Sequence, residues 1–249
     1  MPSQDTVYSF RGDRIELLER GRDARLKAEL YRDGSLVAPT QAGSTVTVTN
    51  AAGVAVVDAQ AVTVSASVAT YTVAAATLAS ETLGSGWVVT WSLVMPDGET
   101  YTYRRACALV RVVPSPVVVH ADLYRRVRTL DPAHDDALHS LSASEIQDKL
   151  DEAWAEIQDE LLKDARRPWL VVESVALRKS HLMLTLSLLF EDFASRQADV
   201  YQDQADRYYR LYRAAWRDVS FAYDEDNDGR SEAGRRAKAP LLITSGGWW

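Results

Sequence analysis

The chain has 249 residues, 47% hydrophobic and 25% charged, with a formal net charge of −7 and a pI of about 5.2. These are ordinary values for a globular protein with one large domain or two smaller ones. They argue against a dedicated nucleic-acid binder, which would usually carry a basic surface and a high pI. Cys107 is the single cysteine, so a disulfide framework within the chain is excluded. Because Cys107 lies in an apolar run, we interpret it as a small buried hydrophobic residue.

The first residues contain neither a basic segment nor an apolar segment, so no secretory signal is visible. No segment approaches the roughly 18 uninterrupted apolar residues of a membrane helix. We therefore expect no membrane partner, and a protein made in a cytoplasm or in something assembled there.

The composition changes near Pro114-Ser115-Pro116, which is a linker signal because proline stiffens the chain and prevents regular pairing. Residues 1–118 hold 10 Lys/Arg and 11 Asp/Glu, which leaves 18 and 24 for residues 119–249. We predict three parts: a β-sandwich accessory domain over 1–118, a helical domain over 119–222, and an acidic loop with an extended docking tail over 223–249.

The first part has the pattern of strands. Leu26, Ala28 and Leu30 alternate with charged residues, which places one set on a core face and the other in water. Similar short runs of β-branched residues follow, separated by turn residues every ten or so positions. Gly84-Ser85-Gly86 is expected to break the chain between two of them. About seven strands fit, which predicts an antiparallel, immunoglobulin-like β-sandwich.

The second part changes to a helical period. Ser142 and Glu145 match a capping box, in which each side chain satisfies a free backbone amide at the start of a helix. Apolar residues recur behind this box at steps of three and four, opposite an acidic face, and predict an amphipathic helix of about five turns. They are Ile146, Leu150, Trp154, Ile157 and Leu161.

Three further helices are predicted in this part. A short one covers Ala121 to Val127. A central one begins near Val172-Glu173-Ser174 and is apolar nearly all round, so it should be the most buried. A third runs from about Asp203 to Val219. The fold class predicted for the whole chain is α+β in two domains, the sandwich followed by an α-helical bundle with an extended C-terminal tail.

The sharpest motif is an acidic loop after the third of these helices. Asp224, Asp226 and Asp228, followed by Gly229, match the first half of a calcium loop, where hard oxygen ligands converge on the ion. Glu232 could supply a fourth carboxylate, although position twelve of such a loop is an arginine here. Two interpretations stay open: a calcium or magnesium site, and an Asp-rich turn that ends the helix. No other cofactor is expected.

The last residues are unusually apolar for a terminus. Side chains of this size contribute about 1.5–3 kcal/mol each when they are buried. The tail is therefore expected to bury itself on its own subunit or to dock onto a partner, and aromatic anchors favour the partner. The candidate partner-binding residues are Leu241, Leu242, Ile243, Trp248 and Trp249.

No catalytic set is visible. The four histidines have no zinc-site spacing, and the sequence lacks a nucleophile elbow, a P-loop and a dinucleotide-binding glycine pattern. We therefore expect a protein that is not an enzyme.

From about Ala121 to Trp249 the chain resembles the head-to-tail connector (adaptor) proteins of tailed bacteriophages. The resemblance lies in the order of parts: a short helix, the capped acidic helix, a break at Arg166-Arg167-Pro168-Trp169, the leucine-rich helix, the Tyr/Arg-rich helix, the Asp224–Gly229 loop and the tail. It covers about half of the chain, and the β-sandwich lies outside it.

The resemblance implies a structural virion protein that forms a ring of about twelve copies at the neck, joining the portal protein to the tail or tail-terminator protein. Such a ring would assemble in the bacterial cytoplasm and would let DNA pass without sequence-specific contact. The alternatives are another phage tail, baseplate or capsid-decoration protein, and a calcium-dependent adhesion or scaffold module.

Overall fold

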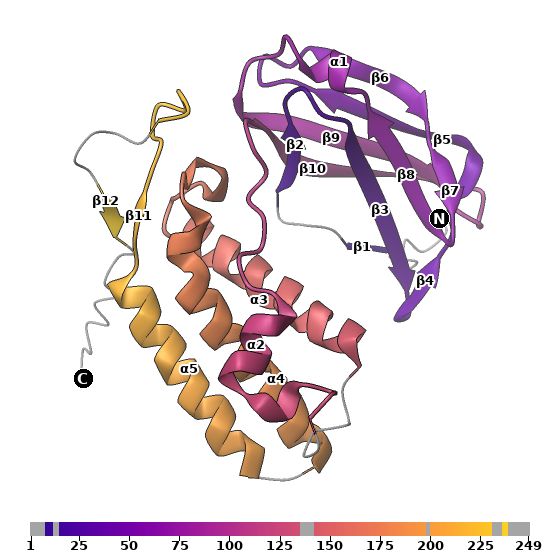
Figure 1. The fold of residues 1–249 in the computed structure, drawn as a ribbon. Helices are drawn as coiled ribbons and strands as arrows, with labels where there is room; N and C mark the ends of the chain where they lie inside the picture. The colour runs from indigo at the N-terminus through magenta and orange to yellow at the C-terminus, as the bar shows by residue number, and fades with distance from the viewer. Residues whose placement is uncertain (1–7, 12–14, 135–141, 198–199, 231–235, 239–249) are drawn as a thin grey trace, which may run out of the picture. The chain divides into compact units, whose positions relative to one another are not determined.

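The computed structural model describes residues 8–11, 15–134, 142–197, 200–230 and 236–238. The chain divides into two compact units, Met1–Val113 and Pro114–Trp249. Figure 1 shows strands in the first unit and helices in the second. The α+β class, with antiparallel sheets before helices, is therefore confirmed at this level.

The first unit contains two five-stranded sheets and one short helix, α1 (Ala75–Leu78). In one sheet the order is β1-β3-β8-β7, with β4 paired to β3: β1 (Ser9–Arg11), β3 (Ala24–Arg32), β8 (Val68–Val73), β7 (Thr63–Ser65) and β4 (Ser35–Val37). In the other the order is β2-β10-β9-β5-β6: β2 (Glu16–Glu19), β10 (Thr100–Val110), β9 (Gly84–Val94), β5 (Thr40–Thr49) and β6 (Ala55–Ala61).

All pairs in these sheets are antiparallel except β2 with β10, which run parallel. The alternation predicted for β3 is confirmed, since Leu26, Ala28 and Leu30 are buried while the side chains between them are more exposed. Both sheets contribute buried side chains to one hydrophobic core, which includes Trp87 and Trp91.

The expected chain break at Gly84-Ser85-Gly86 is wrong. β9 begins at Gly84 and pairs with β10 throughout, with a shift in register between Cys107 and Ala108. Gly84 and Gly86 have positive φ values of 146° and 95°, which glycine adopts without the steric cost of a Cβ atom. These glycines therefore shape an irregular strand end instead of interrupting the sheet.

The second unit is built on helices: α2 (His120–Arg126), α3 (Ala143–Lys163), α4 (Arg178–Gln197) and α5 (Val200–Asp218), with short 3₁₀ turns at Arg128–Leu130, Pro168–Leu170 and Ser174–Leu177. The capping box of α3 is confirmed: the Ser142 hydroxyl accepts the Glu145 amide, and the Glu145 carboxylate accepts the Ser142 amide. All five apolar residues predicted for its core face are buried.

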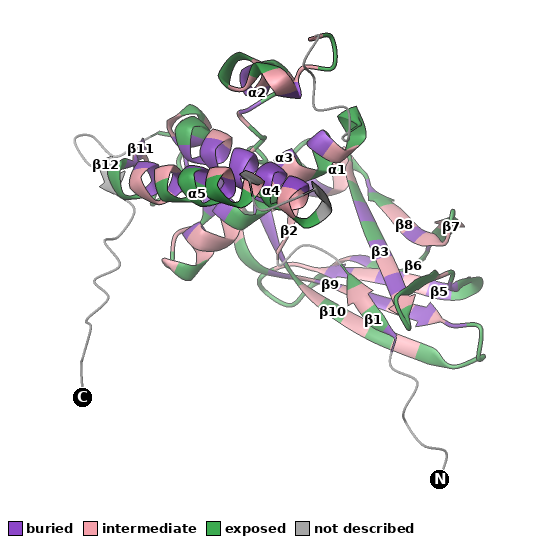
Figure 2. Ribbon diagram, turned by 90° about the horizontal axis from the view of Figure 1, so that it is seen from below, coloured by how far each residue is buried: buried purple, intermediate pink, exposed green. Residues whose placement is uncertain are grey.

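The start of the central helix differs from the prediction. Residues Ser174–Leu177 form a 3₁₀ turn, and α4 proper begins at Arg178. Its central position is confirmed, because α4 packs against α2, α3 and α5. Figure 2 shows buried residues recurring between exposed ones along the helices, as amphipathic packing requires.

A small sheet follows α5 and was not predicted. β11 (Ser220–Ala222) pairs with β12 (Arg236–Lys238), and on its other side Val171 bridges Tyr223. Within the predicted loop and tail, residues 236–238 therefore pair with β11. The remaining tail residues, 239–249, lie outside the described residues, and so does Glu232.

Candidate functional site

The acidic loop is anchored to the 3₁₀ turn that follows α3. The Asp224 amide donates to the Leu170 carbonyl at 2.9 Å, and the Val172 amide donates to the Ala222 carbonyl at 3.0 Å. These two hydrogen bonds attach the segment that leads into the acidic loop, residues 222–224, to residues 170–172. Asp224 itself is buried, whereas Asp226 and Asp228 are exposed.

The loop carboxylates accept hydrogen bonds from the loop's own amides. The two oxygens of Asp224 accept from Asp228 at 2.9 Å and from Gly229 at 2.8 Å. Asp226 accepts from Asp228 at 3.1 Å, and Asp228 accepts from Arg230 at 2.7 Å. One oxygen of each Asp lies within 4.8 Å of the others. The structure therefore brings the three predicted ligands together, while the amides already provide partners for them.

A pocket of about 550 Å³ lies beside this loop, lined by Asp164, Ala165, Arg166, Arg167, Leu170, Tyr223 and Glu225. The Arg166 guanidinium stands over the rings of Phe221 and Tyr223, at 5.7 and 5.6 Å. The Arg167 amide donates to the Tyr223 hydroxyl at 2.9 Å. Because the lining carries two arginines and two carboxylates, the pocket favours neither a simple anion nor a simple cation.

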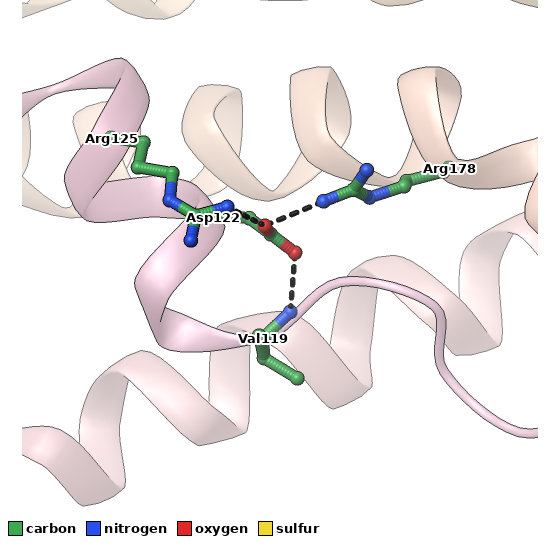
Figure 3. Close-up of polar contacts among 4 residues, drawn as sticks. All are labelled: Val119, Asp122, Arg125 and Arg178. Carbon is green, nitrogen blue, oxygen red and sulfur yellow. Dashed lines mark hydrogen bonds and ion pairs between the residues drawn. The ribbon is translucent and has the colours of Figure 1, made fainter.

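A second polar cluster joins α2 to α4 (Figure 3). Asp122 is buried, and one of its carboxylate oxygens lies 2.6 Å from the Arg178 guanidinium and 3.9 Å from that of Arg125. Its other oxygen accepts the Val119 amide at 3.2 Å, which caps the start of α2. Because both oxygens of the Asp122 carboxylate have structural partners, we interpret this cluster as a contact that holds α2 against α4.

A buried histidine lies between α3 and α4. The His181 Nε2 atom is 2.9 Å from the Leu150 carbonyl, so this nitrogen carries the proton. The His181 ring lies 5.2 Å from the Trp154 ring, and its Nδ1 atom has no partner among the described residues. Burial lowers the pKa of His181 from its ordinary value of 6.5, against smaller opposing effects of the Leu150 carbonyl and Asp151. The neutral ring is therefore the form that fits this site.

Charged side chains form exposed faces on two helices. The face of α3 is acidic and includes the exposed Asp148, Asp151, Glu152 and Glu156. The face of α5 carries mixed charge, since the exposed Arg207, Arg210 and Arg217 lie among the exposed Asp203, Asp206 and Asp218. The exposed acidic face of α3 was predicted from its sequence. The charged face of α5 was not, because its exposed residues are interleaved with the aromatic core residues of that helix.

Glu160 of α3 contacts two residues of α5. Glu160 of α3 accepts the Tyr212 hydroxyl in a short hydrogen bond and pairs with Arg213 at 3.0 Å. Burial, and then the bond to Glu160, raises the pKa of the Tyr212 phenol. Both contacts join α3 to α5.

Cys107 is buried in the first unit, which confirms its interpretation as a hydrophobic residue. Burial, with a smaller effect of Glu16, raises the pKa of the Cys107 thiol to about 12, so this thiol is protonated near neutral pH. None of the helices in the described ranges is long and apolar enough to cross a membrane.

Comparison with protein-family models and with curated proteins finds no match. The solved structure of CopC from Methylosinus trichosporium OB3b is similar to part of the chain, with 13% sequence identity and a TM-score of 0.30. The match covers 41% of this chain and 93% of CopC. A TM-score this low supports no inference about the fold or the function.

Proposed function

We propose that the chain is a non-enzymatic structural subunit, a head-to-tail connector of a tailed phage that joins the portal to the tail as an oligomeric ring. The observation that carries this proposal is the order of parts in the second unit: α2, the capped α3, the buried α4, the Tyr/Arg-rich α5 and the acidic loop, all placed between Pro114 and Trp249. This order is the one on which the resemblance to connector proteins rests.

We also propose a specific architecture for each of the two units. The second unit is a helical bundle around α4, and the first is an immunoglobulin-like sandwich whose two sheets share a core. The sandwich acts as an accessory domain of the virion neck, and the bundle forms the ring. DNA crosses the ring without sequence-specific contact, as suits a chain whose net charge is −7.

In this function the tail is the docking element. Its residues Leu241, Leu242, Ile243, Trp248 and Trp249 combine aliphatic and indole side chains, and aromatic anchors of this kind dominate binding energy at protein interfaces. The partner we assign to them is the portal protein or a neighbouring copy in the ring.

Co-sedimentation of the full chain with the portal protein of the same phage tests the proposal. We expect a stable complex that is lost when residues 241–249 are removed, while the melting temperature of the shortened chain stays unchanged. A chain that never binds the portal contradicts the connector function. Immunogold labelling at the tail tip would then favour the tail or baseplate alternative.

The calcium-dependent module is the second candidate, since three Asp oxygens converge within 4.8 Å. It is the weaker one because Asp226 and Asp228 are exposed, and exposed acidic groups are common without an ion. Calorimetric titration with calcium decides between the two: measurable heat together with a raised melting temperature supports a calcium-binding loop, and their absence removes this candidate.

A further inference from the structure

The first unit contains a pocket of about 590 Å³, distinct from the pocket beside the acidic loop. Its walls come from β1, β3, the turn between β3 and β4, and β10, and β1 lies beside β3 at the end of their sheet (Figure 1). This volume is typical of pockets that hold small organic molecules. The described lining residues are Ser9, Phe10, Arg11, Tyr31, Gly34 and Arg105.

One wall of the pocket is formed by Arg105 of β10, which lies over Phe10 of β1. The guanidinium carbon is 4.4 Å from the centre of the Phe10 ring, and one guanidinium nitrogen donates to the Phe10 carbonyl at 3.2 Å. The Phe10 ring in turn lies 5.1 Å from the ring of Tyr103. These contacts hold the guanidinium in place, so its positive charge is fixed at the wall before a ligand arrives.

Arg11 of β1 supplies a second positive charge. Its cross-strand neighbour is Glu29, whose carboxylate accepts the Tyr31 hydroxyl at 3.1 Å. The side-chain hydrogen bond with Tyr31, and after it the charges of Tyr31 and Glu29, raise the pKa of the Arg11 guanidinium. Glu29 therefore offsets part of the charge of Arg11, while the contact with Tyr31 orients the Arg11 side chain.

The described lining of this pocket is positively charged. Arg11 and Arg105 are cations, and none of the described lining residues is a carboxylate, because Glu29 is not among them. The nearby Arg32 and Asp33 lie 3.9 Å apart and offset each other. The pocket beside the acidic loop differs, since its lining includes two carboxylates. The pocket in the first unit therefore favours an anion.

We propose that this pocket binds the carboxylate of a small organic acid whose body lies against the rings of Phe10 and Tyr31. Guanidinium groups match a carboxylate because their paired N–H donors fit its two oxygens. Both rings are partly exposed, so a ligand that covers them gains from the burial of apolar surface, which a bare inorganic anion does not. The site lies in the first unit, outside the resemblance to connector proteins, and does not depend on the proposed function.

NMR titration of the full chain with benzoate tests the site. We expect saturable shifts at the amides of Phe10 and Gly34, and much weaker binding of benzamide, which has the same ring without the charge. Inorganic phosphate should also bind less tightly than benzoate, because it cannot cover the rings. Glucuronate replaces the aromatic ring with a sugar. Saturable binding of either acid supports the proposal, and the tighter acid identifies the body as aromatic or sugar-like.

Arginine variants locate the binding at this pocket. Arg11→Gln removes one lining charge at an exposed position and should weaken benzoate binding by about tenfold or more, since hydrogen bonds to charged groups are worth that much. Arg105→Gln should weaken it similarly. Because Arg105 also holds the Phe10 carbonyl, its melting temperature is measured alongside, and Arg11→Gln provides the test that does not disturb this contact.

The matched control is Arg104→Gln. This residue precedes Arg105 on β10 and carries the same charge, but it is exposed on the opposite side of the strand, because successive strand residues point to opposite faces. Benzoate binding should be unchanged in this variant.

Three results would overturn the inference: no saturable shifts with either acid, benzamide that binds as tightly as benzoate, or equal effects of Arg11→Gln and Arg104→Gln. Phosphate that binds as tightly as benzoate would contradict the role assigned to the rings. Portal binding is measured separately, so failure of this site leaves the connector function unaffected.

Discussion

At the scale of single residues, His181 links stability to pH. Its folded-state pKa lies below the ordinary value of 6.5, so the unfolded chain binds more protons as the pH falls through that range. The stabilisation from the neutral ring is present above about pH 6.5 and is lost progressively toward the lower folded-state pKa. We expect urea denaturation to show wild type losing more stability between about pH 7.5 and 5.5 than His181→Leu. Equal losses in the two chains would contradict this assignment.

Ala165 ends α3 in a conformation that suits glycine. Its φ is 57°, and the Arg166 amide donates to the Leu161 carbonyl across it at 2.8 Å, as in a Schellman motif. A Cβ atom in this left-handed region costs about 1–2 kcal/mol. Ala165→Gly should therefore raise the free energy of unfolding by about 1 kcal/mol. The control Ala155→Gly, inside the same helix, should lower it by about 1 kcal/mol.

Asp224 is expected to stabilise the acidic loop without any metal. It is 5% exposed and accepts two backbone amides, so Asp224→Ala should cost about 1–3 kcal/mol. Asp226→Ala, at an exposed position, should cost less than about 0.5 kcal/mol. In thermal melts, both with added calcium and with a chelator, Asp224→Ala should lose more stability than Asp226→Ala. A loss that appears only in calcium would instead support an ion in the loop.

At the scale of elements, α3 depends on its contact with α4. Trp154 is 5% exposed and packs against His181, so Trp154→Ala should cost about 3–5 kcal/mol through lost burial and the cavity left behind. The control Asp148→Ala, on the solvent face, should change the free energy of unfolding by less than about 0.5 kcal/mol. Chemical denaturation measures both values. A small effect of the tryptophan variant would mean that contacts other than that of Trp154 hold α3 in place.

The same element shows how far periodicity could be read from the sequence. The capping box and the steps of three and four set the start of α3 and its buried face correctly, because both signals are local. The parallel pairing of β2 with β10 and the pairing of β11 with β12 were not predicted. Pairing joins residues far apart in the chain, and no local pattern specifies the partner of a short strand.

For the candidate sites too, groups that are close in sequence could be predicted, whereas contacts between distant residues could not. Asp224, Asp226 and Asp228 were predicted together because they are close in sequence, and the structure places their oxygens together. The charged face of α5, where exposed arginines and aspartates lie together, could have been found by drawing a helical wheel around the buried Tyr208 and Tyr212. The contact between Glu160 and Tyr212 joins two helices, so no local sequence pattern could have predicted it.

At the scale of the whole molecule, the chain is acidic, with a net charge of −7, and its tail is rich in apolar side chains. Side chains of this kind contribute about 1.5–3 kcal/mol each when they are buried. A contact with another subunit would bury them, which is the basis of our proposal that the chain works in an assembly.

Electron microscopy of the purified chain mixed with the portal protein of the same phage tests the central claim most directly. We expect closed rings of this chain seated on the portal. Dispersed single chains beside bare portals, under conditions in which the chain is folded, would contradict it.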